Sequence, residues 1–374
     1  MGYTSKILNN SVRALSVQQA LIAATGNNIA NVETPGYAKR SVQIETAISS
    51  TNSGQLSIGN GVAIAGLLRA SDEFLSQQAR DAMGEAQRYE VQNDLLKRLE
   101  SLFSLTGEGN TIGSAMSGFV QAMDNLSTDP ASIELRSDFI ERATDLVSTI
   151  NSTFNNLAAL QREADKRIEN ELNVINSLTA QIAQMNGRVT QGEATGNVAA
   201  DARDQRDQLL EKLSEKISYE IIEESNGAVT LYLPNGFPLV QGSNSRALEA
   251  ESTPSFASTP AQALDGAGLN SIVYDYDSGT GEAHLDLTSV IGSGSGTLAG
   301  LLEFRGVYPS NPSDANPFNG SGTVLSVAER VEAITRQLLT SVNEQYLGPD
   351  RDSSTAGHQS SAGDLNGNSP AVFG

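Results

Sequence analysis

A long stretch without helix breakers limits the folds open to this chain. Residues 131–186 contain neither proline nor glycine. Asp129 followed by Pro130 predicts the start of a helix, with Asp129 as N-cap and Pro130 in the first helical position. A helix of roughly 58 residues would be ~87 Å long, so we expect a helical rod. Apolar or small residues recur about every 3.6 residues, as in a helix with one buried face, at Phe139, Ala143, Leu146, Ile150, Thr153, Leu157, Leu160, Ala164, Ile168, Leu172, Ile175, Leu178, Ile182, Met185 and Val189.

Other segments also have helical periodicity. The first, Lys6–Ile29, has a heptad rhythm at Leu8, Val12, Leu15, Ile22 and Ile29, which Gln19 and Gly26 interrupt. An isolated helix of this length is marginal in water, so we expect it to need a partner. Helices are also predicted over residues 72–105, around 116–126, over 201–217 and over 325–346.

The apolar period changes to two between residues 217 and 242, which predicts a β meander. If Ser225–Gly227 is a three-residue loop, Ile221 lies opposite Leu231 and Gly227 is left-handed. A two-residue turn would leave the two apolar faces out of step, so we favour the longer loop. If residues 234–236 also form a three-residue loop, Leu239 lies opposite Leu231 and the meander has one buried face. Further strands or extended arms are expected over residues 42–49, 61–70, 271–276 and 284–291.

These patterns predict a mainly α fold with an inserted β domain. We expect a long antiparallel, coiled-coil-like rod domain, a small antiparallel β domain and an N-terminal helical arm. The predicted divisions are an arm over 1–48, the first part of the rod over 49–217, the β domain over 218–300, return helices over 301–347, and a polar loop over 348–374.

The composition argues against several classes of function. The formal net charge of −20 would repel nucleic acid and anionic membrane surfaces. The chain has no run of 18 apolar residues, so we do not expect a transmembrane helix. Cysteine is absent, and the two histidines, His284 and His358, are far apart in the chain. We therefore expect no catalytic, cofactor-binding or metal-binding residues, and we do not expect an enzyme.

Two acidic clusters are candidate sites. Asp201, Asp204 and Asp207 stand three apart beside two arginines, which favours an exposed, salt-bridged helix face over acid–base catalysis. The string DLNGN at 364–368 is similar to the opening of a calcium loop. Its sixth position is Ser369 instead of glycine, which argues against an ion site.

The string NNIANVETPGYAKR at residues 27–40 is more specific. Its asparagines, among them Asn28 and Asn31, can satisfy backbone groups where a helix ends. Pro35 and Gly36, followed by Tyr37, force a turn. Physical chemistry alone therefore predicts a helix end, a turn and an extended arm.

The same string resembles the N-terminal motif of the axial proteins of the bacterial flagellum, which include rod, hook and hook-associated proteins. Three further stretches resemble the hook-associated protein 1 family: IGNGVAIAGLLRASDEFLSQQAR (58–80), DARDQRDQLLEKLSEKISYEI (201–221) and NGFPLVQG (235–242). The resemblance runs along most of residues 1–347. Rod and hook proteins share only the first motif and lack the long helical section.

The resemblance implies a structural protein of the hook–filament junction, required for filament assembly and exported to the extracellular flagellum by type III export without a cleaved signal. Implied partners are the hook protein, a second junction protein, further copies in a ring and an export chaperone, with no cofactor, nucleic acid or membrane. The implied assembly contacts are Leu8, Val12, Leu15, Ile22 and Ile29. The implied motif turn comprises Asn28, Asn31, Pro35, Gly36 and Tyr37.

Two points remain open at this level. Members of the family usually close with a C-terminal helix that pairs with the N-terminal one, so by that resemblance we expect this chain to be truncated before it. The alternative functions are another flagellar axial protein, of hook or rod type, or a secreted coiled-coil effector or adhesin. The effector or adhesin would share the rod but not the motif.

Overall fold

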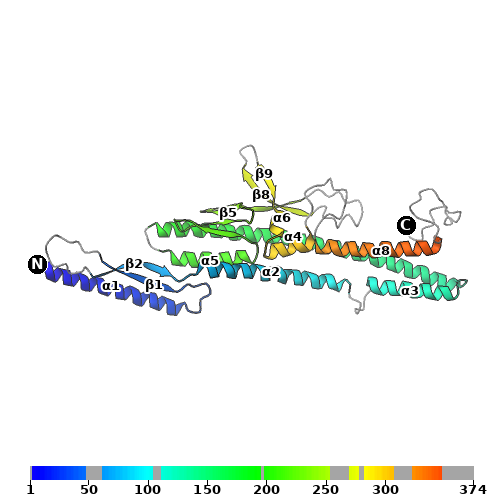
Figure 1. Ribbon diagram of the computed structural model, residues 1–374, viewed down its shortest axis with the longest axis horizontal. Coiled ribbons are helices and arrows are strands. Elements are labelled where there is room, and N and C mark those ends of the chain that lie inside the picture. The colour runs from blue at the N-terminus through cyan, green and yellow to red at the C-terminus, as the bar shows by residue number, and fades with distance from the viewer. Residues whose placement is uncertain are drawn as a thin grey trace. The chain divides into compact units, whose positions relative to one another are not determined.

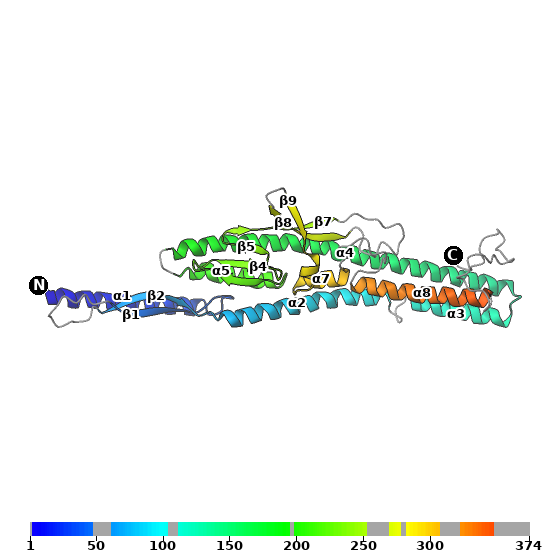
Figure 2. The same cartoon turned by 45° about the horizontal axis from the view of Figure 1, so that its top comes forward.

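The structure is a computed structural model that describes residues 2–47, 61–103, 111–194, 198–252, 269–277, 282–306 and 322–347. In these ranges the chain is mainly helical with three small antiparallel sheets (Figures 1 and 2), which confirms the predicted fold class. Its contacts define two units. Unit 1 comprises Met1–Asp94, Asp165–Ser252 and Asn270–Leu302, and unit 2 comprises Leu95–Ala164, Thr253–Leu269 and Glu303–Gly374. The five-part division at residues 48, 217, 300 and 347 stays a prediction.

The N-terminal part of unit 1 is a helix packed on a hairpin, which we call the arm. It consists of α1 (Gly2–Ala30), β1 (Arg40–Thr46) and β2 (Val62–Arg69). The two strands pair antiparallel, and the register shifts between Gln43 and Ile44. The helix and both strands confirm the elements expected from the sequence.

The longest helix, α4 (Ile133–Glu193), has 61 residues, which corresponds to about 92 Å. It follows α2 (Glu73–Ser101) and α3 (Ile112–Thr128). The expected start at Asp129–Pro130 is wrong by a few residues. Asp129 Oδ1 accepts a bond from the Ala131 amide, an Asx-type turn, and Ser132 Oγ accepts from the Leu135 amide at 3.3 Å. Ser132 therefore caps α4, and Asp129 closes α3.

After α5 (Ala200–Ser214), unit 1 contains a four-stranded sheet in the order β3-β4-β5-β6. Ile221 lies opposite Leu231, and Gly227 has φ of +82°, both as predicted. The strands are β3 (Glu220–Glu223), β4 (Val229–Tyr232), β5 (Pro238–Gln241) and β6 (Asn244–Ser245).

Two details of the predicted meander are wrong. Leu231 pairs with Val240 instead of Leu239, because a bulge shifts the register between Leu231 and Tyr232. The sheet also has more than one buried face. Consecutive residues of β4, Val229, Thr230 and Leu231, are all at most 3% exposed, so both sides of the strand are covered.

A third sheet is formed by β7 (Leu248–Ser252), β8 (Asn270–Asp277) and β9 (Glu282–Asp286). The expected strand over 284–291 is correct only as far as Asp286. There the Asp286 carboxylate accepts bonds from the Thr288 amide and hydroxyl at 2.8 and 2.6 Å. This Asx-type turn ends the strand just before the short helix α6 (Thr288–Gly292), which α7 (Thr297–Arg305) follows.

Unit 2 has a core where α3, α4 and α8 (Thr323–Leu347) pack together. Phe119 is 1% exposed and its ring lies 5.2 Å from that of Phe139, and Leu146 and Leu338 close the cluster. Helix α8 confirms the helix expected over 325–346.

Among the helices described, none combines the length and apolar character needed to cross a membrane.

Candidate functional site: the arm and its clasp

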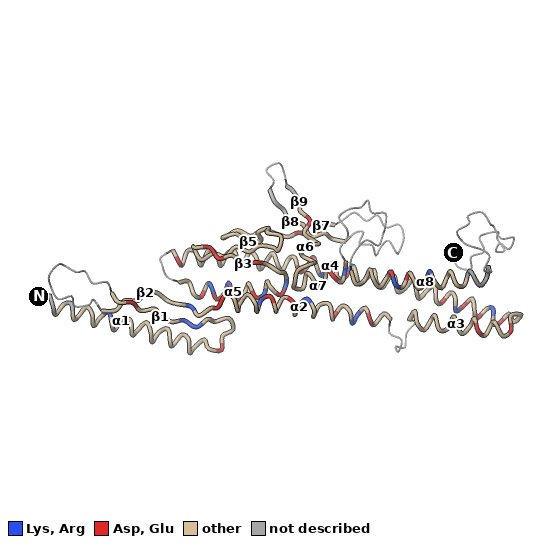
Figure 3. The backbone as a smooth tube through the Cα atoms, in the orientation of Figure 1, with Lys and Arg blue, Asp and Glu red and all other residues tan. Residues whose placement is uncertain are grey.

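Helix α1 exposes a line of large aliphatic side chains. The five residues expected to make assembly contacts are all between 55% and 70% exposed: Leu8, Val12, Leu15, Ile22 and Ile29. Only Lys6 and Arg13 carry charge in α1, which is mostly tan in Figure 3. An exposed apolar line of this length on a helix is typical of a protein–protein contact surface. We name these five residues the stripe.

The opposite side of α1 is the one that meets the hairpin. Val17 is 4% exposed, and Leu21, Ala24 and Asn28 are half-buried at helical spacing. The heptad pattern did not reveal this second face, because only Val17 and Leu21 in it are large and apolar, whereas Ala24 is small and Asn28 is polar. The stripe is thus left free by the hairpin, since the hairpin occupies the other face.

The motif turn is a type II β-turn from Thr34 to Tyr37. The Tyr37 amide donates to the Thr34 carbonyl at 3.2 Å, Pro35 stands at the second position, and Gly36 at the third has φ of +74°. Asn31 lies just before it and donates from Nδ2 to the Asn27 carbonyl at the end of α1. The turn therefore has the residue types that its backbone angles require.

The Asn28 side chain ties the helix to the first strand. Its Nδ2 donates to the Arg40 carbonyl at 2.8 Å, and its Oδ1 accepts from the Arg40 amide and the Tyr37 hydroxyl, each at 2.9 Å. The Arg40 guanidinium lies 4.9 Å above the Tyr37 ring, a cation–π contact. One amide thus fixes where β1 begins relative to α1.

Gly36 in the turn and Gly26 inside α1 provide a matched test of this turn. We expect Gly36→Ala to destabilise the arm by at least ~1–2 kcal/mol, because an L-residue at this positive φ is strained and its Cβ would lie 2.6 Å from Gln208 Cγ. Gly26 lies inside α1, and a Cβ added there would meet nothing within 4 Å. Gly26→Ala should instead stabilise α1 by about 0.8–1 kcal/mol. Amide hydrogen exchange of residues 10–46 measures both effects. Equal protection in Gly36→Ala and the parent chain would contradict this account of the turn.

The hairpin is held to α5 by five charged residues, which we call the clasp. Asp204 is central: its Oδ1 accepts from Arg69 Nε at 2.6 Å and its Oδ2 from Arg40 Nη2 at 3.2 Å. Asp201 binds Arg40 and Asp207 binds Arg69, each at 2.5 Å. Both arginine side chains are 12% exposed and that of Asp204 is 9% exposed. The clasp therefore attaches the two ends of the hairpin, Arg40 and Arg69, to one helix.

The expected exposed acidic face on α5 is only partly correct. The Asp201 side chain is 84% exposed, whereas those of Asp204 and Asp207 are 9% and 31% exposed. Their partners are arginines of the arm, which lie 135 to 164 residues away in the chain, and not the neighbouring Arg203 and Arg206. The repeated aspartates were a usable signal, but nothing local identified what they bind.

The two arginines of α5 face the β3–β6 sheet. Arg203 donates to Glu193 at 2.6 Å and to Glu223 at 2.8 Å, and its hydrogen bond lowers the pKa of Glu193. Arg206 is 2% exposed and donates to Asn186 Oδ1 and the Gly227 carbonyl. Helix α5 therefore binds the arm with its aspartates and the sheet with its arginines.

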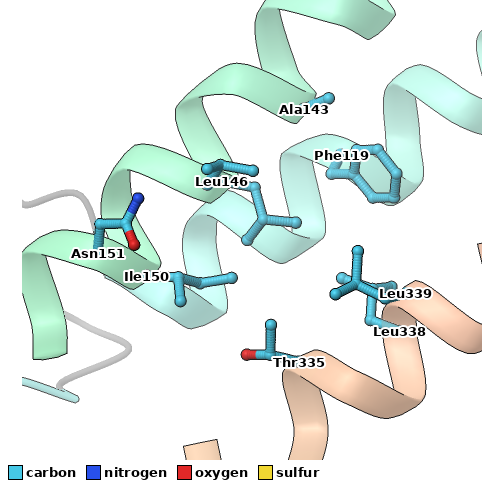
Figure 4. Close-up of a pocket in the computed structure, with 9 residues that line it drawn as sticks. Phe119, Ala143, Leu146, Ile150, Asn151, Thr335, Leu338 and Leu339 are labelled. Atoms are coloured by element: carbon cyan, nitrogen blue, oxygen red, sulfur yellow. The ribbon is translucent and has the colours of Figure 1, made fainter. Parts of the chain in front are cut away.

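An apolar hollow of about 180 Å³ lies in unit 2 between α3, α4 and α8 (Figure 4). Phe119, Leu146, Ile150 and Leu338 are among the side chains around it. Its lining contains no acid, base or nucleophilic thiol. The hollow therefore offers shape and apolar surface, without groups for acid–base or metal chemistry.

Within the described ranges, no group of three or more His, Asp or Glu residues could hold a metal ion. The segment Asp364–Asn368, the second candidate site in the sequence, lies outside the described residues.

Comparison with known proteins gives the context of the arm. Residues 8–37, which hold the stripe and the motif turn, match the family described as "Flagella basal body rod protein". This places the segment in a class of flagellar structural proteins. Residues 96–358 match "Flagellar hook-associated protein FlgK helical domain", which covers more than half of the chain. The chain therefore belongs to the flagellar hook-associated protein FlgK family.

Two curated relatives agree with this assignment. The chain is 27% identical over 303 residues to flagellar hook-associated protein 1 of Salmonella typhimurium, covering 80% of this chain and 52% of that protein. It is 26% identical over 364 residues to flagellar hook-associated protein 1 of Bacillus subtilis, covering 90% and 68%. The solved flagellar hook junction protein FlgK from Burkholderia pseudomallei has 23% identity and a TM-score of 0.49, over 61% of this chain and 38% of that one. The chain spans about half the length of the Salmonella relative.

Proposed function

We propose that this chain is a structural, non-catalytic component of the bacterial flagellum that joins hook to filament and is required for filament assembly. The observation that carries the proposal is the stripe: five large aliphatic side chains, at least 55% exposed, on a nearly uncharged helix in a chain of this family. A surface of this kind needs a covering partner to remove it from water.

We propose the partners on the same ground, that an exposed apolar surface needs a covering protein. The stripe of α1 would contact the hook protein and neighbouring copies in a ring, and the rest of the chain would meet a second junction protein. An export chaperone would cover the apolar surface before assembly, and the protein would be secreted to the extracellular flagellum. The clasp and Asn28 would fix the direction in which the arm presents its stripe, since they bind both ends of the hairpin.

The test compares two variants of the chain: one has a negative charge within the stripe, and the other has the same charge beside the stripe. In a strain that lacks its own copy of the gene, we expect Leu15→Asp to leave cells without filaments and to release filament protein into the medium. The substitution puts a carboxylate where apolar contact is required, which costs binding free energy. Asn9→Asp, on an exposed position of α1 outside the stripe, should still support filaments.

Circular dichroism of both purified variants controls for folding, since neither position is buried. A pull-down with purified hook protein separates a loss of docking from a loss of export. Normal filaments on cells that make only Leu15→Asp would contradict the assignment of the stripe to assembly.

A further inference from the structure

A second, polar pocket of about 80 Å³ lies in unit 1 where several segments meet. It is lined by the end of β2, the start of α2, helix α5 and strands β3 and β4. A single water needs ~10–15 Å³ by the same measure, so the pocket has room for a group several times larger. Four of its lining residues are arginines: Arg69, Arg80, Arg203 and Arg206.

Two of these arginines already have counter-charges. Arg69 is bound by Asp204 and Asp207 of the clasp, and Arg203 by Glu193 and Glu223. The lining carboxylates Asp207 and Glu223 are therefore engaged. The remaining lining acid, Glu73, is solvent-exposed at the start of α2.

The other two arginines are buried with neutral partners only. Arg80 is 6% exposed and donates to Gln77 Oε1 at 2.9 Å, and Arg206 is 2% exposed and donates to Asn186 and to the Gly227 carbonyl. Neither forms an ion pair within the part of the chain described. The Nε atom of each is buried there without a hydrogen-bond partner.

Such an arrangement is costly unless something compensates it. A buried guanidinium loses its hydration, and this loss is not fully offset when no carboxylate bonds to it directly. Buried donors that lack partners in a native fold mark a place where water or an ion is bound. Burial lowers the pKa of Arg206 and outweighs the Asp207, Glu223 and Glu193 carboxylates, which act on it through space. Water could satisfy the two Nε–H groups, but it would add no negative charge.

We propose that this pocket binds one small inorganic oxyanion, of the phosphate or sulfate type, through Arg80 and Arg206. A guanidinium presents a planar fork of donors that matches the oxygens of a tetrahedral oxyanion. Two such forks supply both the charge and the donors that the pocket leaves unused. The pocket volume is large enough to admit such an ion.

Binding would tighten the attachment of the arm. The pocket wall joins Arg69, the last residue of β2, to α2, α5 and the β3–β4 pair. An ion held there contacts segments that are distant in the sequence, so it stabilises their folded arrangement over the unfolded chain. The protein would thus carry a structural anion at the base of its arm.

The experiment is a titration of the intact chain with inorganic phosphate at constant ionic strength, with chloride as the replaced anion. Calorimetry should show one bound phosphate per chain, and Tm should rise by a few degrees at millimolar phosphate. Arg80→Gln removes the charge and keeps a polar side chain, so we expect affinity to fall about tenfold or more. Arg98→Gln is the matched control, because Arg98 lies on the same helix, 42% exposed and outside the pocket.

Phosphate and sulfate also stabilise proteins generally by exclusion from the surface, and that effect would be the same in all variants. An equal Tm rise in the parent chain and in Arg80→Gln would therefore overturn the proposal. If Arg80→Gln does not fold, crystals of the parent chain soaked in selenate decide the matter. An anomalous peak between Arg80 and Arg206 supports the site, and an empty pocket refutes it.

Discussion

Replacing Leu231 with aspartate is expected to unfold the β3–β6 sheet while the helices of unit 2 stay folded. Leu231 is fully buried on the central strand β4, opposite Ile221 on one side and Val240 on the other. Both residues opposite it are aliphatic, so a carboxylate at this position would be buried next to apolar side chains. We expect a loss of more than ~4 kcal/mol in the unfolding free energy of unit 1.

Ile222→Asp is the control for that experiment. Ile222 follows Ile221 on β3 and is 55% exposed. An aspartate carboxylate introduced there remains in water, so the substitution should cost less than about 1 kcal/mol of stability. Urea unfolding followed by circular dichroism should show two transitions, of which only the one from unit 1 moves. A single transition that removes all helical signal in Leu231→Asp would show that the two units are not separate cores.

The second large effect is expected at the centre of the clasp. Asp204→Ala should reduce the stability of the arm's attachment by about 3 kcal/mol, because it leaves two nearly buried guanidinium groups each short of one partner. Arg40 retains Asp201 and Arg69 retains Asp207, so the arm should loosen without unfolding the rest of unit 1.

Asp201→Ala tests whether burial is the cause. Asp201 binds Arg40 as well, but its side chain is 84% exposed, and an exposed ion pair contributes less than about 1 kcal/mol. Hydrogen exchange of β1 and β2, compared with that of α5, measures the attachment directly. A double-mutant cycle with Arg69→Met isolates the Arg69–Asp204 pair. If Asp201→Ala and Asp204→Ala loosen the hairpin equally, the central role of Asp204 is wrong.

Much of the helical fold follows from periodicity. Helices α1, α4 and α8 have apolar residues at helical spacing over many turns, and so their existence is predictable. Their ends depend on single side chains. Ser132 and Asp129 are both good N-cap residues, and only the geometry of the turn between α3 and α4 shows that Ser132 takes that part.

The strands were less predictable for a related reason. The pattern of alternating residues sets Ile221 against Leu231, but the bulge beside Leu239 leaves no local trace in the sequence. Similarly, Asp286 looks like an ordinary strand residue until its carboxylate accepts a bond from the Thr288 amide and turns the chain. Both corrections concern one residue whose effect depends on its tertiary surroundings.

Part of the candidate site could be predicted from the sequence and part could not. The stripe and the motif turn are predictable from a short segment, because their residues lie within one helix and one turn. The clasp was not predicted, because it joins Arg40 and Arg69 to aspartates more than a hundred residues later. Charge patterns show that α5 is rich in both signs, but they cannot say which distant arginines it meets.

That separation along the chain has a consequence for biogenesis. Asp204 follows Arg69 by 135 residues, and a ribosome that adds roughly 5–20 residues per second makes it about 7–27 s later. During this interval the newly made hairpin has no carboxylate of α5 to bind, although α1 and both strands already exist. Closing so long a loop adds little entropy cost beyond that of a shorter one, so the length of the intervening chain does not by itself weaken the clasp. Within unit 1 the arm is thus made first and fixed in place late.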